Sequence, residues 1–188
     1  MVRRIIFVFT IALYASVHLH AGEAPLEKML RLYKKERYKE ACNWGLRYFN
    51  RYKKEGNFIM LYAFSCLHSD YIDRLAVPMT ALRYTPTERK NATYFATILL
   101  QKKMLYQKLL DGLDLTAIRL PETDYVLSIV FDMITKNQYT KKNNAYLLTD
   151  RHNPKKSYKL YLETYSKGKH MILQEYLDGK LIKTHRYW

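Results

Sequence analysis

The spacing of apolar residues changes once along this chain, and that change constrains the fold more than any other feature of the sequence. From Leu26 to Lys136, apolar side chains recur three to four positions apart, as on the buried face of an amphipathic helix. Beyond Lys136 the apolar segments are short, rich in Tyr, Leu, Ile and Thr, and separated by turn residues, which is typical of strands. Helices followed by strands predict an α+β protein.

The helical part is predicted to contain six helices. The charged step at residues 34–37 separates the first two, and Gly56-Asn57 ends the second. Thr85-Pro86-Thr87-Glu88 combines an N-cap residue, a proline at the first helical position and a Glu three residues after the cap, so a long helix should begin here. Further helices are expected at residues 58–67, 71–83 and 121–136. Short turns between them favour an N-terminal antiparallel helical array.

The C-terminal part is predicted to be a small antiparallel β-meander. Lys167-Gly168 and Asp178-Gly179 mark turns, and Asp-Gly is a strong hairpin signal because a tight turn needs positive φ angles. The polar segment 138–144 is expected to be a turn. Four strands are expected at residues 145–148, 157–164, 169–177 and 180–187. We therefore predict a helical region at residues 22–137 and a β-sheet region at 138–188.

The first 21 residues have the parts of a secretory signal peptide. Two arginines precede an apolar run from Ile5 to Leu19, and small residues follow it. This run is about 15 residues long, shorter than the roughly 20 that span a bilayer, which favours a cleaved signal over an uncleaved anchor. We predict cleavage after Ala21 and a periplasmic or secreted mature chain without a membrane span. The first cysteine, Cys42, lies too far on to be a lipid attachment site.

Cys42 and Cys66 fall on two neighbouring predicted helices and form a candidate disulfide. An oxidising compartment permits the bond if the Cα atoms lie within about 7 Å of each other. Closing a loop of roughly 25 residues would stabilise the fold by about 3 kcal/mol in the chain-entropy account. The alternative is two reduced cysteines that act as small apolar core residues.

The sequence carries no contiguous catalytic or cofactor motif. It has no Gly-rich phosphate loop, no Gly-x-Ser-x-Gly and no His-Glu-x-x-His. His170 and His185 lie on neighbouring predicted strands and could face each other, but a zinc site needs three or four ligands. Ser128 and Ser157 have no local signs of an activated nucleophile. We expect no metal, no cofactor and no catalytic residues, with an enzyme of dispersed active site as an alternative.

Positive charge is the second strong feature of the composition. The chain has 32 Lys and Arg against 17 Asp and Glu, a formal net charge of +15. In the predicted strands basic residues alternate with tyrosines, which suggests a surface for an anionic partner. This candidate surface comprises Lys155, Lys156, Lys159, Lys167, Lys169, Lys180, Lys183, Arg186, Tyr158, Tyr161, Tyr165 and Tyr176. The alternative is a generally basic, solvated exterior.

Export decides which anions are relevant. Lys and Tyr together would suit single-stranded nucleic acid in a cytoplasmic protein. An exported chain meets phospholipid headgroups, envelope polymers and acidic proteins instead, so we do not expect nucleic acid as a partner.

The segment Arg37-Tyr38-Lys39-Glu40-Ala41, with the aromatic helix after it, resembles the turn and second helix of a tetratricopeptide repeat. A fainter copy follows at residues 71–82. In the register of that family, Gly45 and Tyr48 stand where an aromatic and a small residue are usual. The resemblance implies paired helices of an α-solenoid and a partner-binding role.

These features together predict an exported, non-enzymatic interaction or scaffold protein that binds another envelope protein. The alternative is a module that binds an anionic envelope polymer or lipid through the basic, tyrosine-rich sheet.

Overall fold

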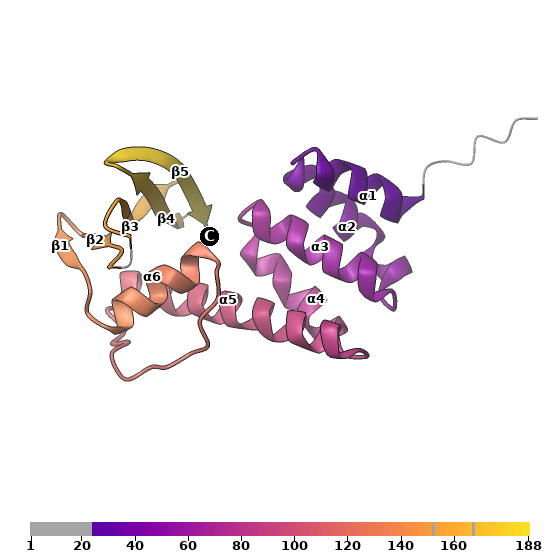
Figure 1. The fold of residues 1–188 in the computed structure, drawn as a ribbon, viewed down its shortest axis with the longest axis horizontal. Helices are drawn as coiled ribbons and strands as arrows, with labels where there is room; N and C mark the ends of the chain where they lie inside the picture. The colour runs from indigo at the N-terminus through magenta and orange to yellow at the C-terminus, as the bar shows by residue number, and fades with distance from the viewer. Residues whose placement is uncertain (1–23, 152, 167) are drawn as a thin grey trace, which may run out of the picture.

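The computed structural model describes residues 24–188, apart from positions 152 and 167, and confirms the predicted α+β fold with a C-terminal β-meander (Figure 1). The predicted signal peptide and its cleavage point after Ala21 lie outside the described residues. Among the helices of the described part, none combines the length and the apolar character that crossing a membrane requires.

The helices are α1 (Pro25–Lys34), α2 (Tyr38–Tyr52), α3 (Gly56–His68), the 3₁₀ turn η1 (Ile72–Leu75), α4 (Ala76–Ala81), α5 (Pro86–Asp111) and α6 (Val126–Thr135). The strands are β1 (Thr140–Lys142), β2 (Ala145–Thr149), β3 (Lys156–Tyr165), β4 (Gly168–Leu177) and β5 (Lys180–Tyr187). Each strand pairs antiparallel with the next, in the order β1-β2-β3-β4-β5.

Small residues let α2 and α3 approach closely. Ala41, Cys42 and Gly45 are the buried residues of α2. A Cβ atom on Gly45 would lie 2.7 Å from Cγ and 2.8 Å from Cβ of Tyr62, which is closer than carbon atoms tolerate. Gly45 is therefore the residue that makes room for the buried Tyr62 ring. The helix crossing depends on it even though glycine lowers helix propensity.

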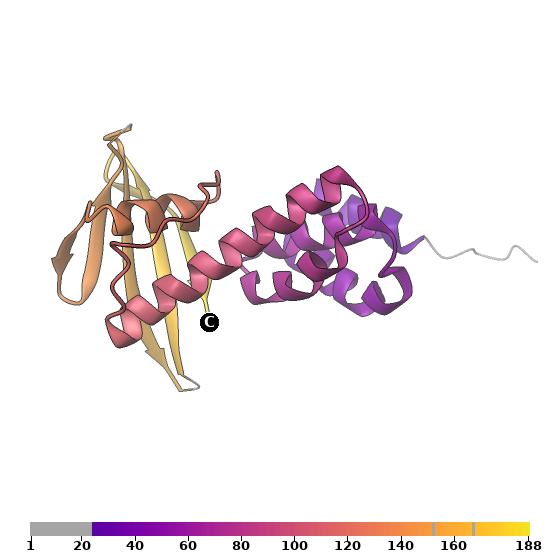
Figure 2. The ribbon, with the colours of Figure 1, turned by 90° about the horizontal axis from the view of Figure 1, so that it is seen from below.

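The long helix α5 connects the helical array to the sheet (Figure 2). The Thr85 side chain accepts a hydrogen bond from the backbone N–H of Glu88 at 3.1 Å, as the N-cap prediction requires. The Glu88 carboxylate accepts from the backbone N–H groups of Arg83 and Tyr84 instead of Thr85. At the other end, Gly112 adopts a φ of 75° and ends the helix.

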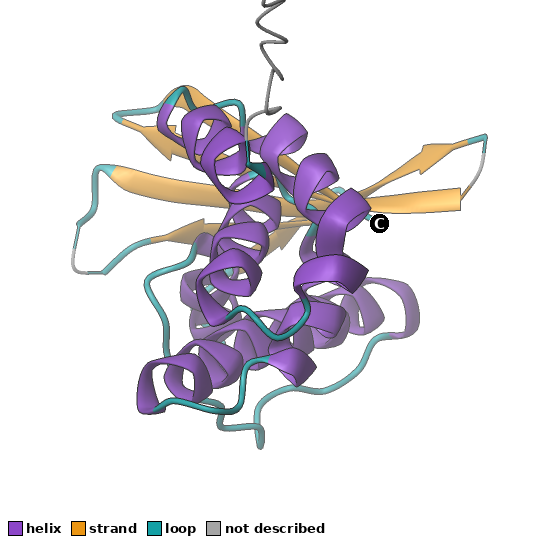
Figure 3. Ribbon diagram, turned by 90° about the vertical axis from the view of Figure 1, so that its right-hand side faces the viewer, coloured by secondary structure: helices purple, strands orange, loops and turns teal. Residues whose placement is uncertain are grey.

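Figure 1 shows α5 and α6 below the sheet and no helix above it, and in Figure 3 the helical array lies in front of the strands. The sheet face turned away from α5 and α6 is called the uncovered face. Leu160 pairs with Leu173 and Leu173 with His185 across three neighbouring strands, so these side chains point to the same face. This is the face that faces the helices, because Leu160 and Leu173 belong to the common hydrophobic core.

Two predicted boundaries were wrong. The segment 138–144, predicted as a turn, contains the edge strand β1; Asn143 and Asn144 have positive φ angles and make a tight turn into β2. All three residues of β1 are exposed, so the strand shows no alternation in the sequence. The last helix begins at Val126 instead of Pro121, whose carbonyl accepts a hydrogen bond from the Gln101 side chain.

The prediction of one continuous helix at residues 71–83 was also wrong. This segment consists of the 3₁₀ turn η1 followed by the six residues of α4. Pro78 lies inside α4, and its missing N–H and its ring limit how far regular helix can extend here.

Candidate interaction surfaces

Strand alternation divides the predicted basic and tyrosine-rich surface between two faces of the sheet. On the uncovered face lie Lys159, Tyr161, Tyr165, Tyr176 and Arg186; on the helix-facing side lie Lys156, Tyr158, Lys169 and Lys183; Lys155 and Lys180 lie at strand ends. Lys167 is outside the described residues. Successive side chains of a strand point in opposite directions, so residues adjacent in sequence do not form one surface.

Tyr158 was wrongly included in the predicted surface. It is 4% exposed and belongs to the hydrophobic core. Burial, with the nearby charges of Asp150 and Glu175, raises the pKa of Tyr158 to about 12. A side chain in this position contacts no partner. The sequence shows that Tyr158 lies on a strand but not which face the helices cover.

A smaller patch remains on the uncovered face. Tyr161 pairs with Ile172, and Ile172 pairs with Arg186 on the next strand. The Lys159 ammonium lies 4.9 Å from the centroid of the Tyr161 ring. Basic and aromatic groups are therefore adjacent here, but over fewer residues than predicted.

A groove of about 380 Å³ lies between α1 and α2, at the end of the molecule away from the sheet (Figure 1). The Trp44 indole N–H donates to the backbone carbonyl of Pro25 at 3.1 Å, which fixes the ring against the start of α1. The Lys28 ammonium lies 3.7 Å from the centroid of this ring, and the Arg47 guanidinium lies 5.5 Å from it. Two cations are thus held beside one aromatic surface.

The groove is strongly positive. Its basic residues are Lys28, Arg31, Arg37 and Arg47, and its one acidic residue is Glu40. Arg37 donates to both oxygens of Glu40, at 2.6 and 2.5 Å, and these hydrogen bonds lower the pKa of Glu40. Glu40 is therefore ionised and paired with Arg37, while Lys28 and Arg47 add positive charge beside Trp44.

Sequence reasoning did not find this groove. The signal was present as two i, i+3 pairs, Lys28 with Arg31 and Trp44 with Arg47, because residues at this spacing share a helix face. The sequence pattern does not show that these faces of α1 and α2 lie side by side.

A second cluster missed from the sequence surrounds His185, which is 1% exposed. Its Nδ1 lies 2.7 Å from an Asp70 oxygen, and its Nε2 lies 2.7 Å from a Glu175 oxygen. The Tyr125 hydroxyl lies 3.2 Å from the same Asp70 oxygen and 3.2 Å from the Tyr187 hydroxyl. Burial by itself lowers the pKa of His185, but the two carboxylates outweigh it and raise the pKa.

This arrangement argues against base catalysis by His185, because both ring nitrogens already bond to carboxylates. It also corrects the expectation that His170 and His185 could face each other. His170 pairs with Glu163 and its ring lies tilted against that of Tyr165 on the uncovered face, whereas His185 faces the helices. Within the described part of the chain, no group of three or more His, Cys, Asp or Glu side chains is arranged to hold a metal ion.

Beside α6 lies a cavity of about 440 Å³ lined by carboxylates. Lys136 forms ion pairs with both Asp132, at 2.7 Å, and Glu122, at 3.5 Å. The two carboxylates therefore share one cation. The Ser128 hydroxyl in this cavity accepts a hydrogen bond from the backbone of Thr123 and contacts no histidine among the described residues.

Cys42 and Cys66 are joined by a disulfide in the structure, with a Cα–Cα distance of 4.8 Å. Both residues are fully buried where α2 crosses α3. The disulfide therefore links α2 covalently to α3 at the crossing where Gly45 packs against Tyr62.

No family model matches this chain, and neither a curated protein nor a solved structure matches it. The tetratricopeptide resemblance stays a prediction from the sequence.

Proposed function

We propose that this protein is an exported, non-enzymatic interaction protein whose α1–α2 groove binds an acidic segment of an envelope protein. The observation that supports this most is the Trp44 indole with Lys28 and Arg47 over its ring. An aromatic surface surrounded by cations favours a segment in which carboxylates flank an apolar side chain, since one contributes charge and the other contact area.

The groove suits a protein partner better than a long polyanion. It has a fixed aromatic group at its centre, and Trp and Arg are the residues most often found at energetic centres of protein interfaces. A partner segment would contact Trp44 with an apolar side chain and place carboxylates near Lys28 and Arg47.

Site-specific photo-cross-linking tests the proposal. A photoreactive residue in place of Asn43, which lines the groove, is expected to capture a discrete protein from native envelope at moderate salt. The same residue in place of the exposed Asn57 is the positional control. Arg47→Glu should abolish capture, whereas Arg51→Glu, the same charge reversal one turn further along α2, should not.

An acidic synthetic peptide of Glu and Leu gives a second readout. Adding this peptide should change the tryptophan fluorescence of the parent and of Trp188→Phe. It should leave the tryptophan fluorescence of Trp44→Phe unchanged, because that variant lacks the indole in the groove. Equal capture from both cross-linking positions, or equal loss with Arg47→Glu and Arg51→Glu, would contradict a specific groove.

The patch formed by Lys159, Tyr161 and Arg186 supports a second candidate function, binding of an anionic envelope polymer or lipid on the uncovered sheet face. Lys159→Glu combined with Arg186→Glu should then reduce retention on envelope material at low salt, because exposed charges act mainly through screened, long-range attraction. These changes should leave photo-cross-linking in the groove unchanged.

A further inference from the structure

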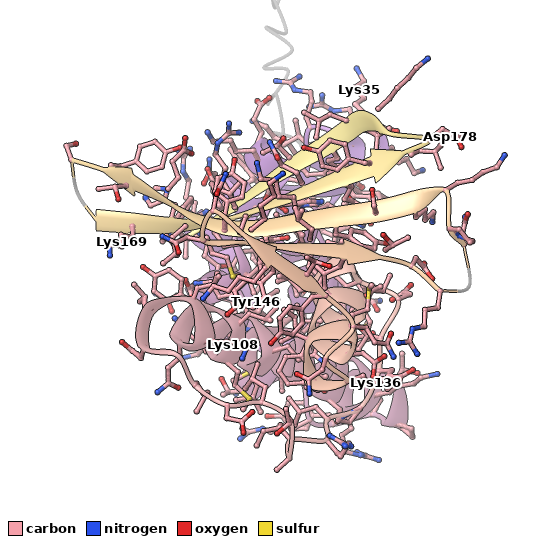
Figure 4. All side chains as sticks on the ribbon, turned by 90° about the vertical axis from the view of Figure 1, so that its left-hand side faces the viewer. Lys35, Lys108, Lys136, Tyr146, Lys169 and Asp178 are labelled. Atoms are coloured by element: carbon pink, nitrogen blue, oxygen red, sulfur yellow. A yellow bond between two sulfur atoms is a disulfide. The ribbon has the colours of Figure 1, made fainter. Side chains whose placement is uncertain are left out.

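A cavity of about 490 Å³ lies where the end of α5 meets the sheet. Three lysines line it: Lys108 from α5, Lys141 from β1 and Lys169 from β4. No aspartate or glutamate is among its described lining residues. Figure 4 labels Lys108 and Tyr146 close together below the sheet, with Lys169 at the start of β4.

The Tyr146 ring lies close to two of the three lysine ammonium groups. Tyr146 is 7% exposed, and its ring centroid lies 5.9 Å from the Lys108 ammonium and 5.5 Å from the Lys141 ammonium. Lys108 also donates a hydrogen bond to the backbone carbonyl of Leu113 at 3.2 Å, which restricts where its ammonium can lie. Two ammonium groups from different elements are thus held near one ring.

These lysines differ from others on α5. Lys102 and Lys103 both form ion pairs with Asp73. Within the described residues, no ion pair joins Lys108, Lys141 or Lys169 to a carboxylate. Three like charges in one concavity repel each other, and a bound anion would replace that repulsion with attraction.

The other lining residues indicate what kind of anion fits. Asn144 and Thr164 offer neutral hydrogen-bonding groups, and Leu109, Leu110 and Leu162 add apolar surface. The cavity therefore combines a charged part with an apolar part. A phosphate ester matches both. Its phosphate carries close to two negative charges in a monoester and one in a diester, with acceptor oxygens in either case, and its organic part can contact Tyr146 and the leucines.

We propose that Lys108, Lys141 and Lys169 form a binding site for a phosphate ester, with Tyr146 against its organic part. The site is separate from the α1–α2 groove and does not depend on the function proposed for that groove. The phosphate could belong to a soluble ester or to a phospholipid headgroup, and the probes below distinguish these sources.

The soluble arm is a calorimetric titration of the protein with glycerol phosphate at low salt, with glycerol as the uncharged control. Lys108→Gln, Lys141→Gln and Lys169→Gln are each expected to weaken binding about tenfold, the loss typical of one charge-assisted hydrogen bond. Lys35→Gln and Lys53→Gln remove the same charge from exposed sites outside the cavity and should change binding less than twofold.

The lipid arm measures flotation with phosphatidylcholine vesicles that contain or lack phosphatidylglycerol. Binding of glycerol phosphate without vesicle binding identifies a soluble ester. Vesicle binding lost in the same three variants identifies a headgroup. Tyr146→Leu, which keeps most of the packing volume, should weaken either interaction while the melting temperature shows that the variant folds.

The proposal is overturned if neither probe binds the parent. It is also overturned if the control lysines reduce binding as much as the cavity lysines, because the attraction would then come from net charge alone.

Discussion

Nδ1 of His185 lies 2.7 Å from Oδ1 of Asp70. This contact joins the last strand, β5, to the turn that follows α3. Glu175, on the neighbouring strand, contacts the other ring nitrogen. Asp70 adopts a φ of 63°, a conformation that aspartate tolerates better than most residues. The buried imidazole thus fastens the helical part to the sheet through two carboxylates, and a cluster of this kind makes folding stability depend on pH.

The pH dependence follows from the two pKa directions. The pKa of His185 is raised on folding, so its contribution to the free energy of unfolding is complete below about 6.5 and is lost as pH rises through the folded-state pKa. The pKa of Glu175 is lowered, chiefly by its hydrogen bond from His185, so its contribution is lost as pH falls below about 4.5. We expect this cluster to stabilise most between these values.

Urea unfolding at pH 5.5, 7 and 8.5 measures this effect. Stability should fall across the series in the parent. His185→Gln should reduce stability by about 2 kcal/mol at pH 5.5 and should flatten the dependence on pH, because it leaves two carboxylates beside a neutral side chain. His68, whose pKa burial lowers, contributes in the opposite direction, so His68→Gln is the matched control. A parent-like slope in His185→Gln would contradict the assignment.

Replacing Gly45 with alanine should destabilise the protein by about 1–3 kcal/mol, because the added methyl group overpacks against the Tyr62 ring. Alanine has the higher helix propensity, so propensity alone predicts the opposite sign. Asn50→Ala at an exposed position of α2 is the control and should be neutral or slightly stabilising. Chemical denaturation of both variants decides between packing and propensity.

The disulfide should be present in the exported protein and should matter for its stability. Thiol titration of the denatured, unreduced mature protein should find no free cysteine. Cys42→Ala combined with Cys66→Ala should lower the free energy of unfolding by about 3 kcal/mol, the value expected for a loop of this length. Two titratable thiols in protein recovered from its native compartment would show that the bond does not form there.

Lys102 and Lys103 are adjacent on α5 and bind the same Asp73, but they should respond differently to truncation. Lys102 is 1% exposed, and its ammonium also bonds to the backbone carbonyl of Trp188, whereas the Lys103 side chain is 58% exposed. Lys102→Ala should cost about 2–4 kcal/mol because buried polar partners lose their donor. Lys103→Ala should cost less than about 1 kcal/mol. Equal losses would contradict the role of burial.

Cleavage of the predicted signal peptide should leave Gly22 as the first residue of the mature chain, three positions before α1 begins at Pro25. N-terminal sequencing of the exported protein tests the position. Arg3→Glu with Arg4→Glu should impair export, because a positive flank orients the apolar segment during insertion. Recovery of an intact chain from Met1 would contradict cleavage.

The sequence by itself determined the parts of this protein that depend on neighbouring residues. The change of period near Lys136 predicted helices followed by a meander, and Thr85-Pro86 predicted where α5 begins. Capping and periodicity act over a few residues, so they can be read without the fold. The same limit explains the errors: β1 has no buried face, and the Gln101–Pro121 contact that precedes α6 links residues 20 positions apart.

The tertiary structure decided the surfaces and the buried cluster. His185 and Asp70 are 115 residues apart in the sequence, and Lys108, Lys141 and Lys169 come from three different elements. Only the packing of the sheet against α5 and α6 determines which face of each strand is buried. This packing buries Tyr158, which the sequence placed on the surface, and it brings the three lysines to one cavity. Local pattern specifies that side chains alternate along a strand, whereas burial of the common core specifies which half of them meets solvent.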